Sequence, residues 1–331
     1  MKRLILIVIL MLTAMFLWAS ACSAQEETPT VLFTADISPE GLISIYDTLG
    51  MEPTGNVAVS LSIGESEKSN YLSPELIGDL VQELDAVIVE SNSANSGSRV
   101  STPEHYQAAE DRGYTEIADF QVLDEYGSRE LPVANGIRLV SDLVGAHFTD
   151  YESYLILTHF SGDAKAGYSG AIKNTAFGLA SSMGKVRIQS GGTSDTHWNN
   201  DLQNEYLEAM AEAGKAVSDA LGDNIIYINV LNRLSIDSDD DPDPSEPEIQ
   251  DIGILASFDP VALDQACLDM IDKAEGMNIC SNVCTNGMVN IRWNMLSKWV
   301  SAQENILCWI LRMDLAMFIS PSKLRKKNWR N

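Results

Sequence analysis

A glycine-rich stretch, residues 154–174, carries the residue types best suited to holding an anion. An apolar run that begins at Tyr154 ends on His159, and three glycines then space a loop that leads into an expected helix. In α/β proteins the carboxyl ends of strands and the amino ends of helices favour anionic ligands, because backbone N–H groups point outward there. The candidate ligand-binding residues are His159, Asp163, Lys165, Lys173, Asn174 and Lys185. We expect a small anionic ligand, a carboxylate or a phosphate, at this loop.

The alternatives to this site are structural. The glycine spacing matches neither G-x-x-x-x-G-K-[ST] nor G-x-G-x-x-G, so a plain strand-to-helix turn with solvated lysines fits the composition equally well. His159 can also be a hydrogen-bonded histidine at a strand end. Lys173, Asn174 and Lys185 are the stronger candidates, because the two lysines flank the helix expected over residues 170–182 and can neutralise an anion. Glu90 and Asp259, at other strand ends, either complete the site or serve as solvated and capping residues.

The elements that position these residues alternate along the chain. Short apolar runs predict strands at 30–35, 56–62, 86–91, 118–123, 154–160, 225–231 and 252–256. Apolar residues at helical spacing predict helices at 39–49, 73–84, 103–112, 170–182, 200–221 and 260–274. Ser73-Pro74 and Asp259-Pro260 each mark a helix start. The alternation indicates an α/β fold with a mostly parallel sheet and helices on both faces.

Several stretches of the chain resemble one bacterial family. They are FTADISPEGLISIYDTLG (33–50), NYLSPELIGDLVQEL (70–84), THFSGDAKAGYSGAIKN (158–174) and DIGILASFDPVALDQACLDMI (251–271). On these the chain is identified as a member of the domain-of-unknown-function family 362 over residues 29–276. The resemblance implies the α/β fold but little about activity. Because some members are described as iron–sulfur proteins, a metal-dependent or redox enzyme is an alternative function, and a decayed, inactive product is another.

The chain departs from this family where relatives carry soft metal ligands. Ser161-Gly162-Asp163 stands where the family has Lys-Gly-His, and Ser238-Asp239-Asp240 replaces Cys-Asp-Cys. Cys267 is the one cysteine between the two chain ends, so neither a disulfide nor an iron–sulfur cluster is expected in the domain. We therefore expect no cofactor. Asp237, Asp239 and Asp240 suit only a hard cation such as calcium, although Pro242 replaces the glycine of a calcium loop and a solvated acidic loop is the alternative.

The amino-terminal residues have the pattern of an export signal. Lys2 and Arg3 precede an apolar run, and small residues then lead to Cys22. Residues 1–22 thus predict a lipoprotein signal peptide in which Cys22 is lipidated, and ordinary cleavage after Ala21 is the alternative. A lipid anchor would tether an extracytoplasmic protein to a membrane. The net charge of −25 would repel the phosphates of nucleic acid, so no nucleic-acid partner is expected.

Residues 277–331 differ in composition from the rest of the chain. They hold eight basic and two acidic residues, and they include four of the six tryptophans. A basic binding patch and a terminal amphipathic helix are two explanations. A third explanation, a frameshift, is better. When codons for ICSNVCTNGMVNIRWNMLSKWVSAQE are written with freely chosen third bases and translated two bases further on, they can yield MLERMHERNGEHPLEYAEQVGLGSG. Family members end in very similar text, so we interpret residues 277–331 as a frameshifted, non-native tail.

Overall fold

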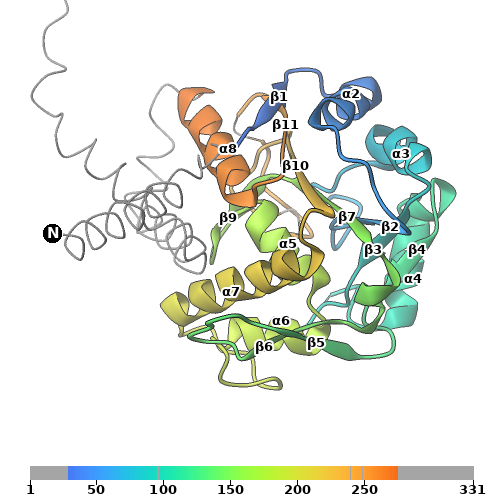
Figure 1. Ribbon diagram of the computed structural model, residues 1–331. Coiled ribbons are helices and arrows are strands. Elements are labelled where there is room, and N and C mark those ends of the chain that lie inside the picture. The colour runs from blue at the N-terminus through green and yellow to red at the C-terminus, as the bar shows by residue number, and fades with distance from the viewer. Residues whose placement is uncertain (1–28, 95–96, 239, 248, 275–331) are drawn as a thin grey trace, which may run out of the picture. The chain divides into compact units, whose positions relative to one another are not determined.

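The computed structural model describes residues 29–94, 97–238, 240–247 and 249–274 (Figure 1). The predicted signal peptide, Cys22 and the predicted frameshifted tail therefore lie outside the described residues. Contacts divide the chain after Thr30, and all elements below belong to the unit that begins at Val31. Within the described residues, no helix is both long enough and apolar enough to cross a membrane.

The central sheet of this unit has the strand order β1-β11-β10-β7-β2-β3-β4. Five neighbouring strands, from β10 to β4, run parallel, while β11 is antiparallel to both β10 and β1. The strands are β1 (Leu32–Thr34), β2 (Val57–Ser60), β3 (Val87–Glu90), β4 (Phe120–Val122), β7 (Ser153–His159), β10 (Ile225–Leu231) and β11 (Gly253–Ser257). The mostly parallel sheet predicted from the alternating pattern is thus confirmed.

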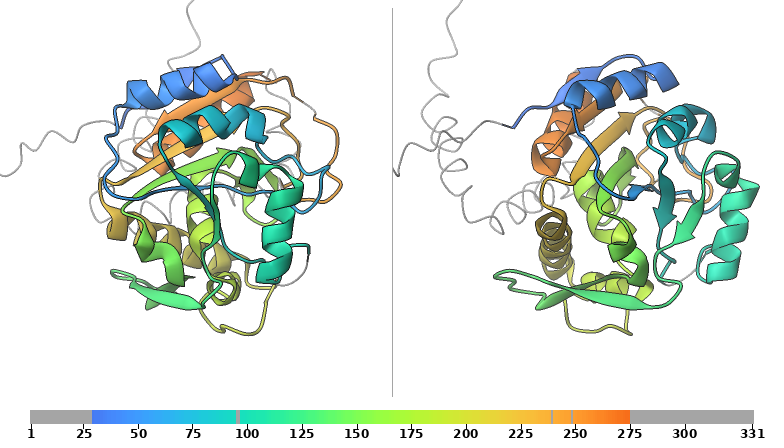
Figure 2. Two further views of the ribbon diagram at one scale, coloured as in Figure 1. Left: turned by 90° about the vertical axis from the view of Figure 1, so that its right-hand side faces the viewer. Right: turned by 45° about the vertical axis from the view of Figure 1, so that its right-hand side comes forward.

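Helices cover both faces of the sheet, as expected (Figure 2). On one face lie α2 (Pro39–Leu49), α3 (Pro74–Glu83) and α4 (Thr102–Asp111). On the other lie α5 (Ala171–Leu179), α6 (Ser182–Gln189), α7 (Gln203–Leu221) and α8 (Pro260–Ala274). In β7, Leu155 and Leu157 pack into the core on the side of α2, α3 and α4. Tyr154 and Ile156 pack into the core on the side of α5 to α8. A strand buried on both faces must be apolar at every position, which explains the uninterrupted run.

Both predicted helix starts are found, and a side-chain capping bond is present at Asp259 but not at Ser73, the N-cap of α3. Asp259 Oδ1 accepts from the backbone N–H groups of Val261 at 2.8 Å and Ala262 at 3.0 Å, so Asp259 caps α8. Ser38 does the same for α2, because its Oγ accepts from Gly41 N at 3.1 Å. Asp259 is therefore a capping residue, which was one of its two predicted roles.

The helix predicted over residues 170–182 is wrong in its extent. The chain leaves the helical conformation at Ala180, where α5 ends, and Ser181 then caps a separate helix, α6, by accepting from Gly184 N at 3.1 Å. Two hairpins were also not predicted, namely β5 (Ser128–Pro132) with β6 (Ser141–Gly145) and β8 (Ser161–Asp163) with β9 (Gly167–Ser169). β5 is largely exposed and β8–β9 is rich in glycine, so neither carries a buried-strand pattern. Short 3₁₀ turns at Tyr114–Glu116 and Ala146–Asp150 complete the described elements.

Candidate functional site

Charged side chains gather at the carboxyl ends of the parallel strands. β2, β3, β7 and β10 run in the same direction, so the segments that follow them emerge at one edge of the sheet. Glu65 follows β2, Glu90 ends β3 and His159 ends β7. We call this part of the molecule the carboxyl edge.

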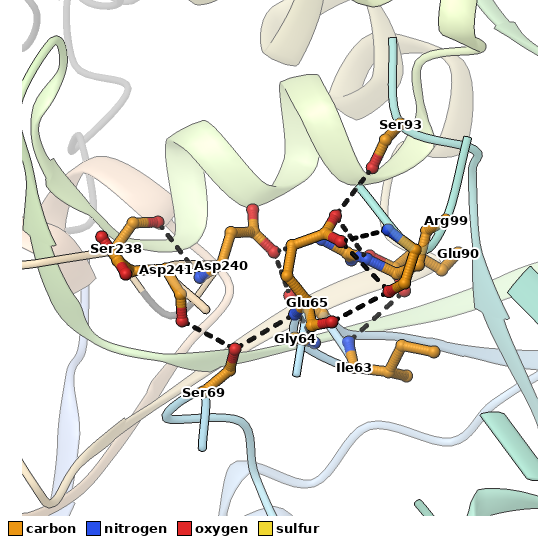
Figure 3. A network of polar contacts seen from close by, with 12 residues as sticks. Ile63, Gly64, Glu65, Ser69, Glu90, Ser93, Arg99, Ser238, Asp240 and Asp241 are labelled. Carbon is orange, nitrogen blue, oxygen red and sulfur yellow. Dashed lines mark hydrogen bonds and ion pairs between the residues drawn. The ribbon is translucent and has the colours of Figure 1, made fainter. Parts of the chain in front are cut away.

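A buried guanidinium, that of Arg99, organises the carboxyl edge (Figure 3). Its Nη1 donates to Glu90, and its Nη2 lies 2.9 Å from Glu65 Oε1 and 2.6 Å from Asp240 Oδ1. Burial alone would raise the pKa of the Glu90 carboxyl, but the Arg99 charge outweighs it and holds that pKa below its usual value. Three carboxylates from distant parts of the sequence thus meet around one cation.

Glu90 is also bound by a buried histidine. His105 Nε2 lies 3.1 Å from Glu90 Oε2, and its Nδ1 lies 3.2 Å from Asn92 Oδ1. The backbone N–H of Ile63 donates to the same Glu90 oxygen at 3.3 Å. α4 positions His105 for these contacts. Glu90 is therefore part of the candidate site rather than a solvated or capping residue.

The predicted glycine loop is the β8–β9 hairpin, with Gly167 at a φ of 89°. Lys173 Nζ pairs with Asp163 Oδ2 at 3.0 Å, and Asp163 Oδ1 accepts from the N–H groups of Lys165 and Ala166. Burial opposes the charge on Asp163, but Lys173 and these donors lower its pKa. The structure therefore brings the predicted Asp163 and Lys173 together.

The amino end of α5 is occupied by a side chain of the protein itself. Asp264 Oδ1 accepts from Ala171 N at 2.8 Å, and Asp264 Oδ2 accepts from Ile172 N at 3.1 Å. A Cβ on Gly170 would lie 2.5 Å from Asp264 Oδ1, so the glycine is required for this approach. The sequence predicts an external anion at this helix end, and such an anion would have to displace Asp264.

The remaining predicted ligand-binding residues face different partners. Lys165 Nζ bonds to Asn200 Oδ1 at 3.2 Å and lies 4.8 Å above the ring of Tyr206. Asn174 Nδ2 donates to the Gly170 carbonyl at 3.0 Å. Lys185 lies within α6 and does not flank one long helix with Lys173, because the chain breaks at Ala180. It nevertheless reaches the carboxyl edge, where its Nζ donates to the carbonyls of Ser91 and Asn92 at 2.8 and 2.9 Å.

His159 is buried and uncharged at the end of β7. Its Nε2 lies 2.6 Å from the Asn232 carbonyl, so the proton sits on Nε2, and burial followed by the Arg233 charge lowers its pKa to about 4. Its Nδ1 has no hydrogen-bond partner among the described residues. The same holds for three further buried atoms within one residue of a strand end: Ser91 Oγ, Thr158 Oγ1 and Asn232 Oδ1.

The acidic residues predicted to bind calcium do not share one partner. Asp237 Oδ2 accepts from Ser245 N at 2.8 Å, while Asp240 Oδ1 is held by Arg99 and by Ser62 Oγ at 2.8 Å. Asp239 lies outside the described residues. The described chain contains no group of three or more histidine, cysteine, aspartate or glutamate side chains arranged for a metal ion. Calcium binding stays a prediction.

Sequence reasoning missed Arg99, Glu65 and Asp264. Arg99 and Glu65 lie in the loops after β3 and β2, and their position just beyond two strand ends is the signal that could have found them. Asp264 carried no such signal, because it lies inside a helix and reaches α5 only through the packing of α8.

The comparisons with known proteins identify the family of the chain. The model described as "Domain of unknown function (DUF362)" matches residues 57–269. The chain belongs to this family. The matched DUF362 segment runs from β2 into α8 and so contains the whole carboxyl edge. No curated protein matches the chain significantly.

One solved structure similar to this DUF362 chain is the lactate racemase apoprotein from Thermoanaerobacterium thermosaccharolyticum. The two are 13% identical with a TM-score of 0.37, over 60% of this chain and 50% of that one. The chain thus spans about half the length of that protein. A likeness this distant says nothing about the activity of the DUF362 chain.

Proposed function

We propose that this DUF362 domain binds a small anionic ligand, a carboxylate or a phosphate, at the carboxyl edge, with Arg99, Lys173 and Ser62 as its donors. The observation that carries the proposal is the way in which Asp240 is held. Arg99 Nη2 and Ser62 Oγ contact its carboxylate at 2.6 and 2.8 Å. The charges of Arg99 and Lys173 outweigh burial and hold the pKa of Asp240 below its usual value. Arg99 and Ser62 thus hold the Asp240 carboxylate in the way that proteins hold a bound anion.

Unpartnered polar atoms at the same edge support this proposal. Buried polar groups nearly always have a hydrogen-bond partner, and an exception needs an explanation such as a water or a ligand. His159 Nδ1, Ser91 Oγ and Asn232 Oδ1 are such exceptions within the described part of the chain. Of these atoms, Ser91 Oγ can donate to an anion at the carboxyl edge, whereas His159 Nδ1 and Asn232 Oδ1 accept and would need a donor such as a hydroxyl group on the ligand.

We expect replacement of Lys173 with glutamine to weaken anion binding about ten-fold or more, because a hydrogen bond to a charged group contributes roughly 1.5–3 kcal/mol. The measurement is calorimetric titration of the domain with inorganic phosphate and with citrate. Lys165→Gln is the matched control, since Lys165 faces Asn200 and the Tyr206 ring. Circular dichroism at the assay temperature establishes that both variants are folded. Equal losses in the two variants, or no binding by the wild type, would contradict the proposal.

The proposal also places the domain outside the cytoplasm, tethered to a membrane through lipidated Cys22. It is supported by the residue pattern around the cysteine alone. We expect a palmitate analogue to label the wild-type protein and the membrane fraction to contain it, whereas Cys22→Ala should lose both. Cys267→Ala, which changes a buried thiol of the domain, is the control and should keep the label. Equal labelling of wild type and Cys22→Ala would remove the lipoprotein from the proposal.

A further inference from the structure

The anion site at the carboxyl edge is covered by an acidic segment of the same chain, residues 240–247, which we call the strap. The strap lies against the loop that follows β2, and polar groups make the contacts (Figure 3). Ser66 Oγ donates to the Pro242 carbonyl at 2.6 Å, and Ser69 Oγ donates to the Asp241 carbonyl at 2.7 Å. The strap is thus held by hydrogen bonds and ion pairs at the place where Asp240 enters the site.

The strap has little else to hold it in place. None of its residues is buried, and its sequence, DDPDPSEP, contains no large apolar side chain. The outer ion pair, Lys68 to Asp243 at 2.7 Å, joins side chains that are 73% and 78% exposed, so solvent screens it strongly. A segment with no buried residue and no apolar packing opens at a lower cost in free energy than an element of the core.

Asp240 presents to Arg99 and Ser62 the same chemical group that a carboxylate ligand would present. Its side chain is 45% exposed, whereas that of Arg99 is 4% exposed, so the aspartate lies at the mouth of the site and the arginine at its base. A ligand carboxylate in place of the Asp240 carboxylate would leave the charge of the carboxyl edge unchanged. Exchange of one anion for the other therefore has no large electrostatic penalty.

We infer that Asp240 is a tethered competitor for the anion site, and that a ligand binds by displacing the strap from the loop after β2. This inference rests on the proposed function and adds regulation to it. A competitor on a short tether acts at an effective concentration in the millimolar range, so weak contacts suffice to keep the site occupied. Only a ligand that outcompetes Asp240 would then open the strap.

The test combines ligand binding with hydrogen–deuterium exchange of the strap. Asp240→Asn should bind phosphate or citrate about ten-fold more tightly than the wild type, because the tethered competitor is weakened. Asp243→Asn removes one charge from the same strap at the exposed Lys68 pair, and it should bind with an affinity within about two-fold of the wild type. In the wild type, addition of the bound anion should speed amide exchange at residues 240–247.

The outcomes separate the two proposals. If no variant binds either anion, the proposed function is wrong. If the anions bind while the strap exchanges at an unchanged rate, the site exists but Asp240 is not its competitor. Equal gains in affinity for Asp240→Asn and Asp243→Asn would also overturn the inference, because they would show a general effect of charge.

Discussion

Replacing Arg99 with methionine is expected to lower the free energy of unfolding by about 3–5 kcal/mol, the usual cost of removing one partner from a buried ion pair. Glu90 and Glu65 are 6% and 14% exposed, so without the guanidinium they would be left as carboxylates with little access to water. Urea denaturation at pH 7 measures the loss. Arg99→Lys should be intermediate, because an ammonium cannot match the three-sided contact of the guanidinium fork.

Arg129→Met is the matched control for this prediction. Arg129 is exposed on β5, and its replacement should change the free energy of unfolding by less than about 0.5 kcal/mol. Adding Glu90→Gln to Arg99→Met should recover part of the loss, since one uncompensated charge disappears. An Arg99→Met variant as stable as Arg129→Met would show that the carboxylates do not converge on Arg99.

The second large effect is expected at Asp142, in β6. This carboxyl is fully buried, Leu143 N donates to its Oδ1 at 2.8 Å, and its Oδ2 has no partner among the described residues. Burial raises its pKa from 3.8 to about 7. The folded protein therefore binds more protons than the unfolded chain between these values, so stability falls as the pH rises from about 4 to 7.

Asp142→Asn should remove this part of the pH dependence and stabilise the protein at pH 8. The gain cannot exceed about 4 kcal/mol, because each pKa unit corresponds to about 1.36 kcal/mol. The cost of burying the polar asparagine amide reduces this gain. Thermal unfolding at pH 5 and pH 8 measures the difference between wild type and variant, which should be larger at pH 8.

Asp163→Asn is the comparison, because Lys173 lowers the pKa of that buried carboxyl. A group with a lowered pKa stabilises the fold above its unfolded pKa and ceases to do so as the pH falls. Asp163→Asn should therefore lose stability at pH 8, opposite in sign to Asp142→Asn. If both variants change stability in the same direction at pH 8, the two carboxyls do not differ in environment as the structure shows.

Much of the fold could be predicted because its signals are local. The run from Tyr154 is apolar at every position since β7 is covered on both faces, and Asp259-Pro260 starts α8 through bonds to residues two and three positions away. Such patterns depend on the period of an element and on its caps, which neighbouring residues determine. The break at Ala180 was missed because the residues on both sides of it are compatible with a helix.

The sequence by itself determined the family, the α/β fold and the sheet edge at which the charged residues gather. It also placed Asp163 and Lys173 in one candidate site, on the glycine-rich loop and at the start of the helix after it. Only the tertiary structure decided which charges meet. Arg99 binds Glu65, Glu90 and Asp240, and Asp264 fills the amino end of α5 from 92 positions away along the chain. The physical reason is that an ion pair or a buried hydrogen bond depends on distance in space and on burial, and neither follows from residue type or spacing along the chain.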